Sequence, residues 1–540
     1  MGTWGSGQDA GRAVPPGSRP AGIGRRALVG LAAAVVVAGA TLLTPVGVAS
    51  AQPDGRSALL GTRWTADKDL GSLYTVTKSA GVHDLRLRAD SQGRKVTGKG
   101  IGVALIDSGI APVPGLDGVQ VFNGPDLSFE SQASNLRYLD TFGHGTHMAG
   151  IIAGRDALVT DSSVNDPRYF VGVAPDANLI SVKVATSDGA VDVSQVIAGI
   201  DWVVAHRNDP GLNIRVINLS YGTDSVQPYQ VDPLAHAVEM AWRKGIVVVV
   251  AAGNDGNASE RLTNPAVDPY VIAVGAADSR GTEIRTDDTV ATFSSRGSVT
   301  RTPDLVAPGR SLVSLRDPGS SIDKEFPTAV VTDAKGVPRF FRGSGTSQAA
   351  AFTSGTVALL LQQRPTLTPD QVKRLLTSTA DPIAATNVRL QGAGLIDVKQ
   401  AGEIATPTAT QTFPISTGTG LLESARGTSH VADPENGIEL TGEKDIFGKV
   451  WSGKVWAEAS WNGRSWAGGT WNGSTWTGSA WSGRSWASTA WAGTSWTGRS
   501  WAGRSWAGNV WSGGSWSGGS WTGRSWAGRS WAGRSWATYT

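Results

Sequence analysis

Five runs of apolar residues recur between residues 99 and 400, and helical patterns separate them. The runs are continuous rather than alternating, at residues 101–106, 179–184, 216–219, 246–252 and 271–274. Apolar residues at helical spacing lie between them, near residues 144–153, 193–206 and 233–244. Continuous apolar strands that alternate with helices are typical of a mainly parallel sheet with helices on both faces. We therefore predict an α/β fold for this block.

Polar side chains follow three of these runs, where the predicted strands end. Asp107 ends the first run, and Asn254 follows the fourth. Asn218 and Ser220 lie at the end of the third. A single aspartate in such a place commonly caps the next turn. Several polar residues at the carboxyl edge of one parallel sheet favour a ligand site instead.

A serine at position 347 begins an alanine-rich helical pattern. We predict a helix from about Ser347 to Gln363, with Pro365 just beyond its end. Backbone N–H groups and the positive dipole end of a buried helix stabilise an oxyanion formed beside them. Ser347 is therefore a candidate nucleophile, although an isolated Gly-Thr-Ser is more often only a helix N-cap.

Histidine is scarce, with 6 residues in the chain. His144 lies between two glycines, which lets its ring approach a neighbour closely. His147 follows one turn later, so a zinc pair is the alternative interpretation. The usual i, i+4 spacing with an intervening glutamate is missing, and we expect no metal at this pair. We predict that His147 forms hydrogen bonds within the core.

Four of these stretches resemble the signature blocks of subtilisin-like serine proteases. They read VALIDSG at 103–109, GHGTHMAG at 143–150, AAGN at 251–254 and GTS at 345–347. Their order, Asp then His then Ser, is also that of subtilisin. Shorter stretches at 216–222, 291–297 and 306–309 resemble the family as well. The resemblance covers residues 99–404 and implies a subtilisin-like fold, in a secreted, actinobacterial type with a Trp-rich tail.

The resemblance implies a role for each residue. Ser347 would attack the peptide carbonyl, His144 would carry the proton, and Asp107 would orient His144. The Asn254 amide and the Ser347 N–H would bind the oxyanion. Further residues would bind the substrate backbone or wall the pocket before the cut bond, namely Ser220, Tyr221, Gly222, Ala251, Ala252 and Gly253.

Two departures from the family stand out. The serine is usually followed by Met-Ala-Ser-Pro, whereas Gln348 begins a Gln-Ala-Ala-Ala stretch here. We expect activity with altered packing behind the serine. Residues 52–98 are also too few for a large propeptide domain, and they include a predicted extended segment at 72–77. No cofactor is required for the chemistry, and the sequence identifies no structural calcium site.

The first 51 residues match a secretory signal. Arg25 and Arg26 precede an apolar run at 27–43, and Ala-Ser-Ala follows at 49–51. We expect export, by the general or the twin-arginine route, and a mature chain that begins near Gln52. A membrane anchor is the rival interpretation, but the run is short for a membrane span.

The region after residue 365 is predicted to close the catalytic block and then to connect it to a tail. Thr368 to Gln371 read as a capping box, with a helix through about Ser378. Residues 405–450 read as a linker, with a hairpin whose turn lies at Asn436 and Gly437.

A tryptophan recurs every five residues from Trp451 to Trp536, in a Trp-x-Gly-x-Ser-like unit. Of the 22 tryptophans in the chain, 18 belong to this tail at 451–540, which carries arginines and no acidic residue after Trp461. A low-complexity extension is one interpretation. The other is a surface that binds cell-wall glycan or the cell surface, because exposed rings and arginines favour binding.

Two hypotheses for the function of the chain remain. The chain has no cysteine, so disulfides are excluded. The formal charge of +3 says little about partners, and we expect no nucleic acid partner. The leading hypothesis is a secreted, monomeric serine endopeptidase that acts on proteins or peptides. The alternative is a catalytically silent surface-binding protein that uses the Trp-rich tail.

Overall fold

The computed structural model describes residues 64–65, 71–132, 135–258, 260–384, 386–432, 439–446, 450–461, 470–471 and 474–475. The chain divides into two units, residues 1–50 and 51–540, and all described residues belong to the second. The predicted signal sequence and most of the tryptophan repeat lie outside the described residues.

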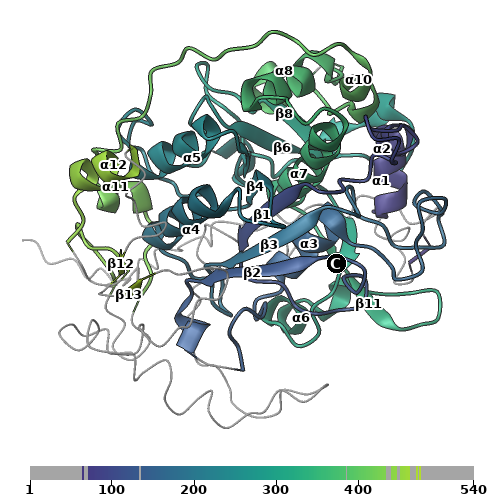
Figure 1. Ribbon diagram of the computed structural model, residues 1–540, viewed down its shortest axis with the longest axis horizontal. Helices are drawn as coiled ribbons and strands as arrows, with labels where there is room; N and C mark the ends of the chain where they lie inside the picture. Colours follow the sequence, from purple (N-terminus) through teal and green to yellow (C-terminus); the bar gives the residue numbers. More distant parts are fainter. Residues whose placement is uncertain are drawn as a thin grey trace, which may run out of the picture. The chain divides into compact units, whose positions relative to one another are not determined.

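An eight-stranded sheet forms the centre of the fold, and it is mainly parallel as predicted (Figure 1). Its strands run in the order β2-β3-β1-β4-β5-β6-β7, and β8 pairs with β6. Only β7 is antiparallel to its neighbour. The strands are β1 (Gly102–Asp107), β2 (Val121–Asp126), β3 (Asn178–Lys183), β4 (Ile214–Leu219), β5 (Val247–Ala251), β6 (Ile272–Asp278), β7 (Thr289–Val290) and β8 (Leu305–Pro308).

Helices cover both faces of this sheet. On one side α3 (His144–Ala153) packs against α7 (Thr346–Gln363), and α7 crosses β4, β5 and β6. On the other side α4 (Val193–His206) packs against α5 (Pro233–Arg243) (Figure 1). These four helices lie within one or two residues of the predicted ranges.

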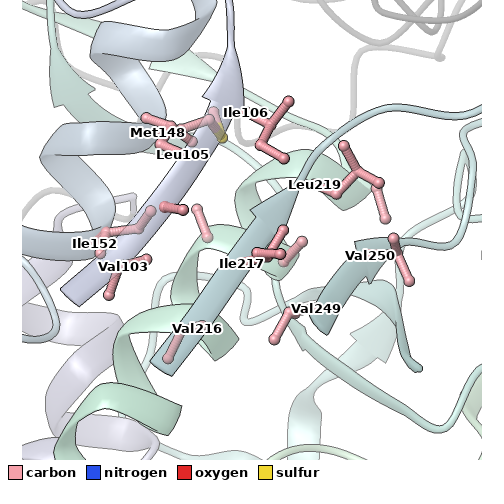
Figure 2. Close-up of a cluster of buried hydrophobic side chains, with 14 of the residues drawn as sticks. Val103, Leu105, Ile106, Met148, Ile152, Val216, Ile217, Leu219, Val249 and Val250 are labelled. Carbon is pink, nitrogen blue, oxygen red and sulfur yellow. The ribbon is translucent and has the colours of Figure 1, made fainter. Parts of the chain in front are cut away.

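The core between the sheet and α3 explains the continuous apolar runs. Figure 2 shows Val103 and Leu105 of β1 beside Met148 and Ile152 of α3, and all four side chains are fully buried or nearly so. Ile217 of β4 is also fully buried. Because helices cover both faces, strand positions of either parity must be apolar, and the alternating pattern of a half-exposed strand disappears.

The remaining elements surround this centre. A second sheet has the order β10-β11-β9, built from β9 (Leu312–Leu315), β10 (Val330–Thr332) and β11 (Pro338–Gly343), and a short pair is formed by β12 (Thr470–Trp471) and β13 (Ser474–Thr475). The other α-helices are α1 (Leu73–Ser79), α2 (Val82–Arg86), α6 (Ser321–Glu325), α8 (Pro369–Thr379), α9 (Val388–Gln391), α10 (Val398–Glu403), α11 (Leu422–Arg426) and α12 (Gly453–Trp461). The predicted capping box of α8 is present.

The extended segment predicted at residues 72–77 is wrong, because this stretch forms α1. The Ser72 hydroxyl caps the helix by accepting from the Thr75 N–H at 3.2 Å. Leu73, Val76 and Ala80 are all buried, at helical spacing. Burial of this face against the core outweighs the strand propensity of its threonines, valine and tyrosine.

The region after α10 lies against the catalytic block. Residues 405–420, here called the strap, contain no helix or strand, yet the Ser416 N–H donates to both Glu239 carboxylate oxygens, at 2.9 and 3.0 Å. The predicted hairpin is reduced to one antiparallel bridge, Ala432 to Glu439, and its turn lies outside the described residues.

Candidate active site

The carboxyl ends of β1, β4 and β5 meet at one edge of the sheet. The strands are parallel neighbours, with Leu105 opposite Asn218 and Ile106 opposite Leu219. The next residues along, Asp107 and Ser220, therefore leave the sheet side by side. This edge is where open α/β sheets bind ligands.

Asp107 and His144 form a buried pair at this edge. His144 Nδ1 lies 2.8 Å from Asp107 Oδ1 and 3.0 Å from Oδ2. The side chains are 1% and 0% exposed. A carboxylate at this distance accepts the Nδ1 proton, which holds the ring in one orientation and one tautomer.

The glycines around His144 allow this approach. A Cβ at Gly145 would lie 2.1 Å from the Gly109 carbonyl oxygen and 3.2 Å from Asp107 Oδ1. Only a residue without a side chain lets the start of α3 come this close to the end of β1.

Asp140, which no motif in the sequence marked, accepts hydrogen bonds from the residues that flank Asp107 and His144. One of its oxygens accepts from the Ser108 hydroxyl at 2.8 Å and from the Gly143 N–H at 2.7 Å. The other accepts from the Thr146 N–H at 2.7 Å. Its signal in the sequence is an aspartate four residues before the start of a helix, which suits a carboxylate that caps orphan N–H groups.

A buried cation lies behind Asp107. Lys183 Nζ is 2.8 Å from Glu130 Oε2 and donates to the Ser108 carbonyl oxygen at 3.0 Å. Burial lowers the pKa of Lys183, but Glu130 and Asp126 more than offset this, so the pKa is raised overall. The lysine therefore stays charged and fixes the backbone next to Asp107.

Ser347 lies in the first turn of α7 and is 5% exposed. Its carbonyl oxygen accepts from the Ser220 hydroxyl at 3.4 Å. That hydroxyl also accepts from the Asn218 amide at 3.0 Å, and Asn218 is held in turn by the Ser354 hydroxyl at 2.9 Å. These contacts join the start of α7 to the carboxyl end of β4, next to Asp107.

Asn254 is oriented by Thr346. Its side-chain oxygen accepts from the Thr346 N–H and from the Thr346 hydroxyl. The amide nitrogen is thereby turned toward Gly345. A Cβ at Gly345 would lie 3.6 Å from Asn254 Nδ2, 3.7 Å from the Ser347 backbone nitrogen and 2.7 Å from Gln348 Oε1, so the two donors and the Gln348 side chain lie around one space.

The predicted substrate residues lie at the ends of β4 and β5, at this edge of the sheet. The Gly253 N–H donates to the Thr346 hydroxyl at 3.2 Å, and the Ala252 carbonyl oxygen accepts from the Thr263 N–H at 3.1 Å. Ala251 ends β5. Ser220, Tyr221 and Gly222 follow β4, and the Tyr221 side chain is 1% exposed. The structure thus gathers these segments at one edge, with the tyrosine ring turned into the protein.

His147 is a core histidine, as predicted. Its Nε2 lies 3.2 Å from the Phe341 carbonyl oxygen, and burial lowers its pKa to about 3. Among the residues that the structure describes, no group of three or more His, Cys, Asp or Glu side chains is arranged to hold a metal ion.

The comparisons with known proteins identify the family of this chain. The model of the Subtilase family (Peptidase_S8) matches residues 98–402. The chain belongs to the subtilase family. Serine protease AprX of Bacillus subtilis is 39% identical over 315 residues, which are 57% of this chain and 67% of that protein. Subtilisin E of Bacillus subtilis is 33% identical over 338 residues, 61% of this chain and 72% of that protein.

Two solved structures are also similar to this subtilase. MycP1 with its N-terminal propeptide removed is 28% identical, with a TM-score of 0.45, over 62% of this chain and 98% of that chain. Fervidolysin from Fervidobacterium pennivorans is 26% identical, with a TM-score of 0.48, over 71% of this chain and 52% of that chain. The family and its named relatives show that the chain is a subtilisin-like serine protease, acting on proteins or peptides.

Proposed function

We propose that Ser347, His144 and Asp107 form the catalytic triad of a secreted serine endopeptidase. The observation that carries this proposal is the buried Asp107–His144 hydrogen bond of 2.8 Å at the edge where Ser347 is tied to Ser220. A carboxylate that fixes Nδ1–H leaves Nε2 as the base for a serine hydroxyl.

The reaction has two halves. Ser347 Oγ attacks the peptide carbonyl carbon while its proton passes to His144 Nε2. The C–N bond then breaks, His144 returns the proton to the leaving amine, and an acyl-enzyme remains. Water deprotonated by His144 hydrolyses this ester and restores Ser347. The Asp107 carboxylate stabilises the imidazolium in both halves.

The developing oxyanion is assigned to Asn254 Nδ2 and the Ser347 N–H. Both donors border the space beside Gly345, which supports this assignment. Donors fixed before the reaction stabilise charge without reorganising. The chemistry needs no cofactor, and no step here uses a metal.

The substrate backbone is proposed to add as a strand along Ser220, Tyr221 and Gly222. Ala251, Ala252 and Gly253 would wall the pocket for the side chain before the cut bond. This assignment is supported because both segments lie at the sheet edge where Ser347 is held by Ser220. Because the Tyr221 ring is buried, its backbone would contact the peptide.

Export and retention at the cell wall are the remaining parts of the proposal. The signal-like residues 1–51 support export. Within the described part of the chain, no helix combines the length and apolar character needed to span a bilayer.

The repeat is proposed to bind cell-wall glycan through its rings and arginines. Deleting residues 462–540 should release the enzyme from isolated cell walls, and unchanged retention would contradict this.

Covalent labelling tests the catalytic assignment. A serine-directed phosphonate should label the mature protein on Ser347, as located by peptide mapping. Ser347→Ala should abolish the label while it keeps the thermal transition of the parent, and His144→Ala should slow labelling greatly. An unlabelled, folded parent that cuts no protein would favour a silent surface-binding protein.

A further inference from the structure

Two loops flank the carboxyl end of β1. In the sheet order β3-β1-β4, residues 184–192 connect β3 to α4, and residues 220–232 connect β4 to α5. The strands are parallel, so both loops leave the sheet at the edge where Asp107 lies. Under the proposed function, a peptide bound at Ser347 lies along residues 220–222 of the second loop.

Residues after the strap hold the second loop. We call residues 421–432 and 439–446 the brace. The Thr223 hydroxyl donates to the Ala425 carbonyl oxygen at 2.7 Å, and Asp224 Oδ1 accepts from the Thr428 N–H at 2.6 Å. The Gln227 amide oxygen accepts from the Leu421 N–H at 2.9 Å.

The fit between the brace and this loop is close. Gly427 has φ +61°, and a Cβ there would lie 2.2 Å from Asp224 Oδ1. Any other residue would both strain the backbone and push Asp224 away.

The brace holds the first loop through a buried ion pair. Arg426 Nε donates to Asp192 Oδ2 at 2.6 Å, and both side chains are 0% exposed. Arg426 also donates to the carbonyl oxygens of Gly442, at 2.7 Å, and Lys444. The Ile446 N–H adds a bond to the Ser194 hydroxyl at 2.9 Å. Asp192 is the N-cap of α4, so the loop and the helix start are fixed together.

Tyr221 lies in the segment that joins the brace to the active site. Two residues after it, the Thr223 hydroxyl donates to the Ala425 carbonyl oxygen of the brace. Ser220, the residue before Tyr221, donates to the Ser347 carbonyl oxygen. The brace therefore contacts the loop that contains Tyr221, whose backbone is proposed to bind the substrate peptide.

We propose that the brace sets the width of the peptide-binding channel, with Arg426 as its positioning residue. The inference rests on the proposed function, because it needs residues 220–222 to bind the peptide. Separating the two loops would weaken binding of extended peptides on the acyl side of the cut bond. It would affect a substrate that reaches only the residues around Ser347 much less.

The test compares a single and a double variant with the parent on two substrates. Arg426→Met alone leaves Asp192 as a buried, unpaired charge, so it also lowers stability. Asp192→Asn with Arg426→Met removes both charges, and Asn keeps the oxygen that caps the Ser194 N–H at 2.9 Å. Rates are measured per phosphonate-titrated active site, on an internally quenched octapeptide and on a single-residue ester.

The double variant should lower the octapeptide-to-ester ratio of kcat/KM by about tenfold, mainly through a higher octapeptide KM. Arg285→Met is the matched control. Arg285 pairs with Asp381 at 2.7 Å and donates to the Ile396 carbonyl oxygen at 3.0 Å. It lies outside the two loops and the brace, so its loss should leave the ratio unchanged.

Two results would overturn the inference in distinguishable ways. Equal loss on both substrates in the double variant would make the brace a purely structural element, with the triad intact. A parent that neither reacts with the phosphonate nor cuts either substrate would overturn the proposed function and the inference together.

Discussion

The side-chain oxygen of Asn254 accepts two hydrogen bonds from Thr346, one from its backbone N–H at 2.9 Å and one from its hydroxyl at 3.0 Å. A backbone N–H must face an acceptor, so the oxygen of the Asn254 amide is identified and its nitrogen points the other way. The same Thr346 hydroxyl accepts from the Gly253 N–H. Thr346 thus holds the proposed oxyanion donor in place before any substrate binds.

Replacing this donor should impair the chemical step. Asn254→Asp keeps the acceptor for Thr346, removes the donor and adds a charge of the wrong sign. We expect kcat to fall by about 10²–10³, the size known for the corresponding loss in subtilisin, with little change in KM. Steady-state kinetics on the ester measure this. Thr346→Ser, which keeps both hydrogen bonds, should stay near the parent, and a fall of less than tenfold in Asn254→Asp would argue against the assignment.

Gly345→Ala should impair activity strongly. Gly345 has φ 164°, extended backbone that any residue adopts. Its new Cβ would nevertheless lie beside Asn254 Nδ2 and the Ser347 nitrogen, where the oxyanion is proposed to lie. It would also lie 2.7 Å from Oε1 of the buried Gln348, which must shift. We expect kcat to fall at least as far as in Asn254→Asp, with a lower thermal transition because Gln348 is displaced. Parent-like kcat would show that the oxyanion lies elsewhere.

The sheet and its central helices were predictable because each is specified locally. The run at 101–106 is apolar at every position but one, and it becomes β1 with a shift of one residue. The helix at 144–153 has the predicted bounds. Short motifs also marked Asp107 and His144, since glycines must lie beside groups that approach so closely.

Other features depend on partners that are distant in the chain. α1 was predicted as extended because its residues favour strands, and only the core against which it packs makes it a helix. The brace was predicted as a linker with a hairpin. Arg426 shows why, because its partner Asp192 lies 234 residues away and no local pattern links them.

Glu239, which accepts from Ser416 of the strap, should make stability depend on pH. Its carboxyl group is buried, and so is that of Asp268. Burial raises the pKa of Glu239 to about 7, although the Ser416 N–H, Asp268 and Arg243 each lower it, and burial together with Glu239 raises that of Asp268. At these two groups the folded protein therefore binds more protons than the unfolded chain above a pH of about 4.3. Their contribution to stability should fall as pH rises from there toward neutrality.

Glu239→Gln tests this pH dependence. The amide keeps an oxygen acceptor for the Ser416 N–H but cannot ionise. We expect the variant to lose less stability than the parent between pH 5 and 8, by thermal unfolding at each pH. Glu403→Gln is the control, because Glu403 pairs with Arg88 at a site where both side chains are over a third exposed. Identical slopes for Glu239→Gln and the parent would contradict the prediction.

The first two tryptophans of the repeat are part of the folded unit. Trp451 and Trp456 are 5% and 4% exposed, with ring centroids 5.2 Å apart. Trp456 also meets the ring of His236 edge-on, at 5.2 Å, and its Nε1 donates to Asp201 Oδ2 at 3.2 Å. Their burial requires that a tail deletion begin after α12.

Trp456→Ala should destabilise the protein by about 3–5 kcal/mol, because it empties a buried aromatic site between α5 and the strap. Trp456→Phe keeps a ring in the site but loses the hydrogen bond to Asp201 and part of the buried ring volume, so it should cost less than the alanine variant, about 1–3 kcal/mol. Denaturant unfolding of the parent and both variants measures the loss of stability in each variant. Deletion from residue 451 should resemble the alanine variant, whereas deletion from 462 should keep the parent's stability. If both deletions unfold at the same denaturant concentration as the parent, Trp451 and Trp456 contribute nothing to the fold.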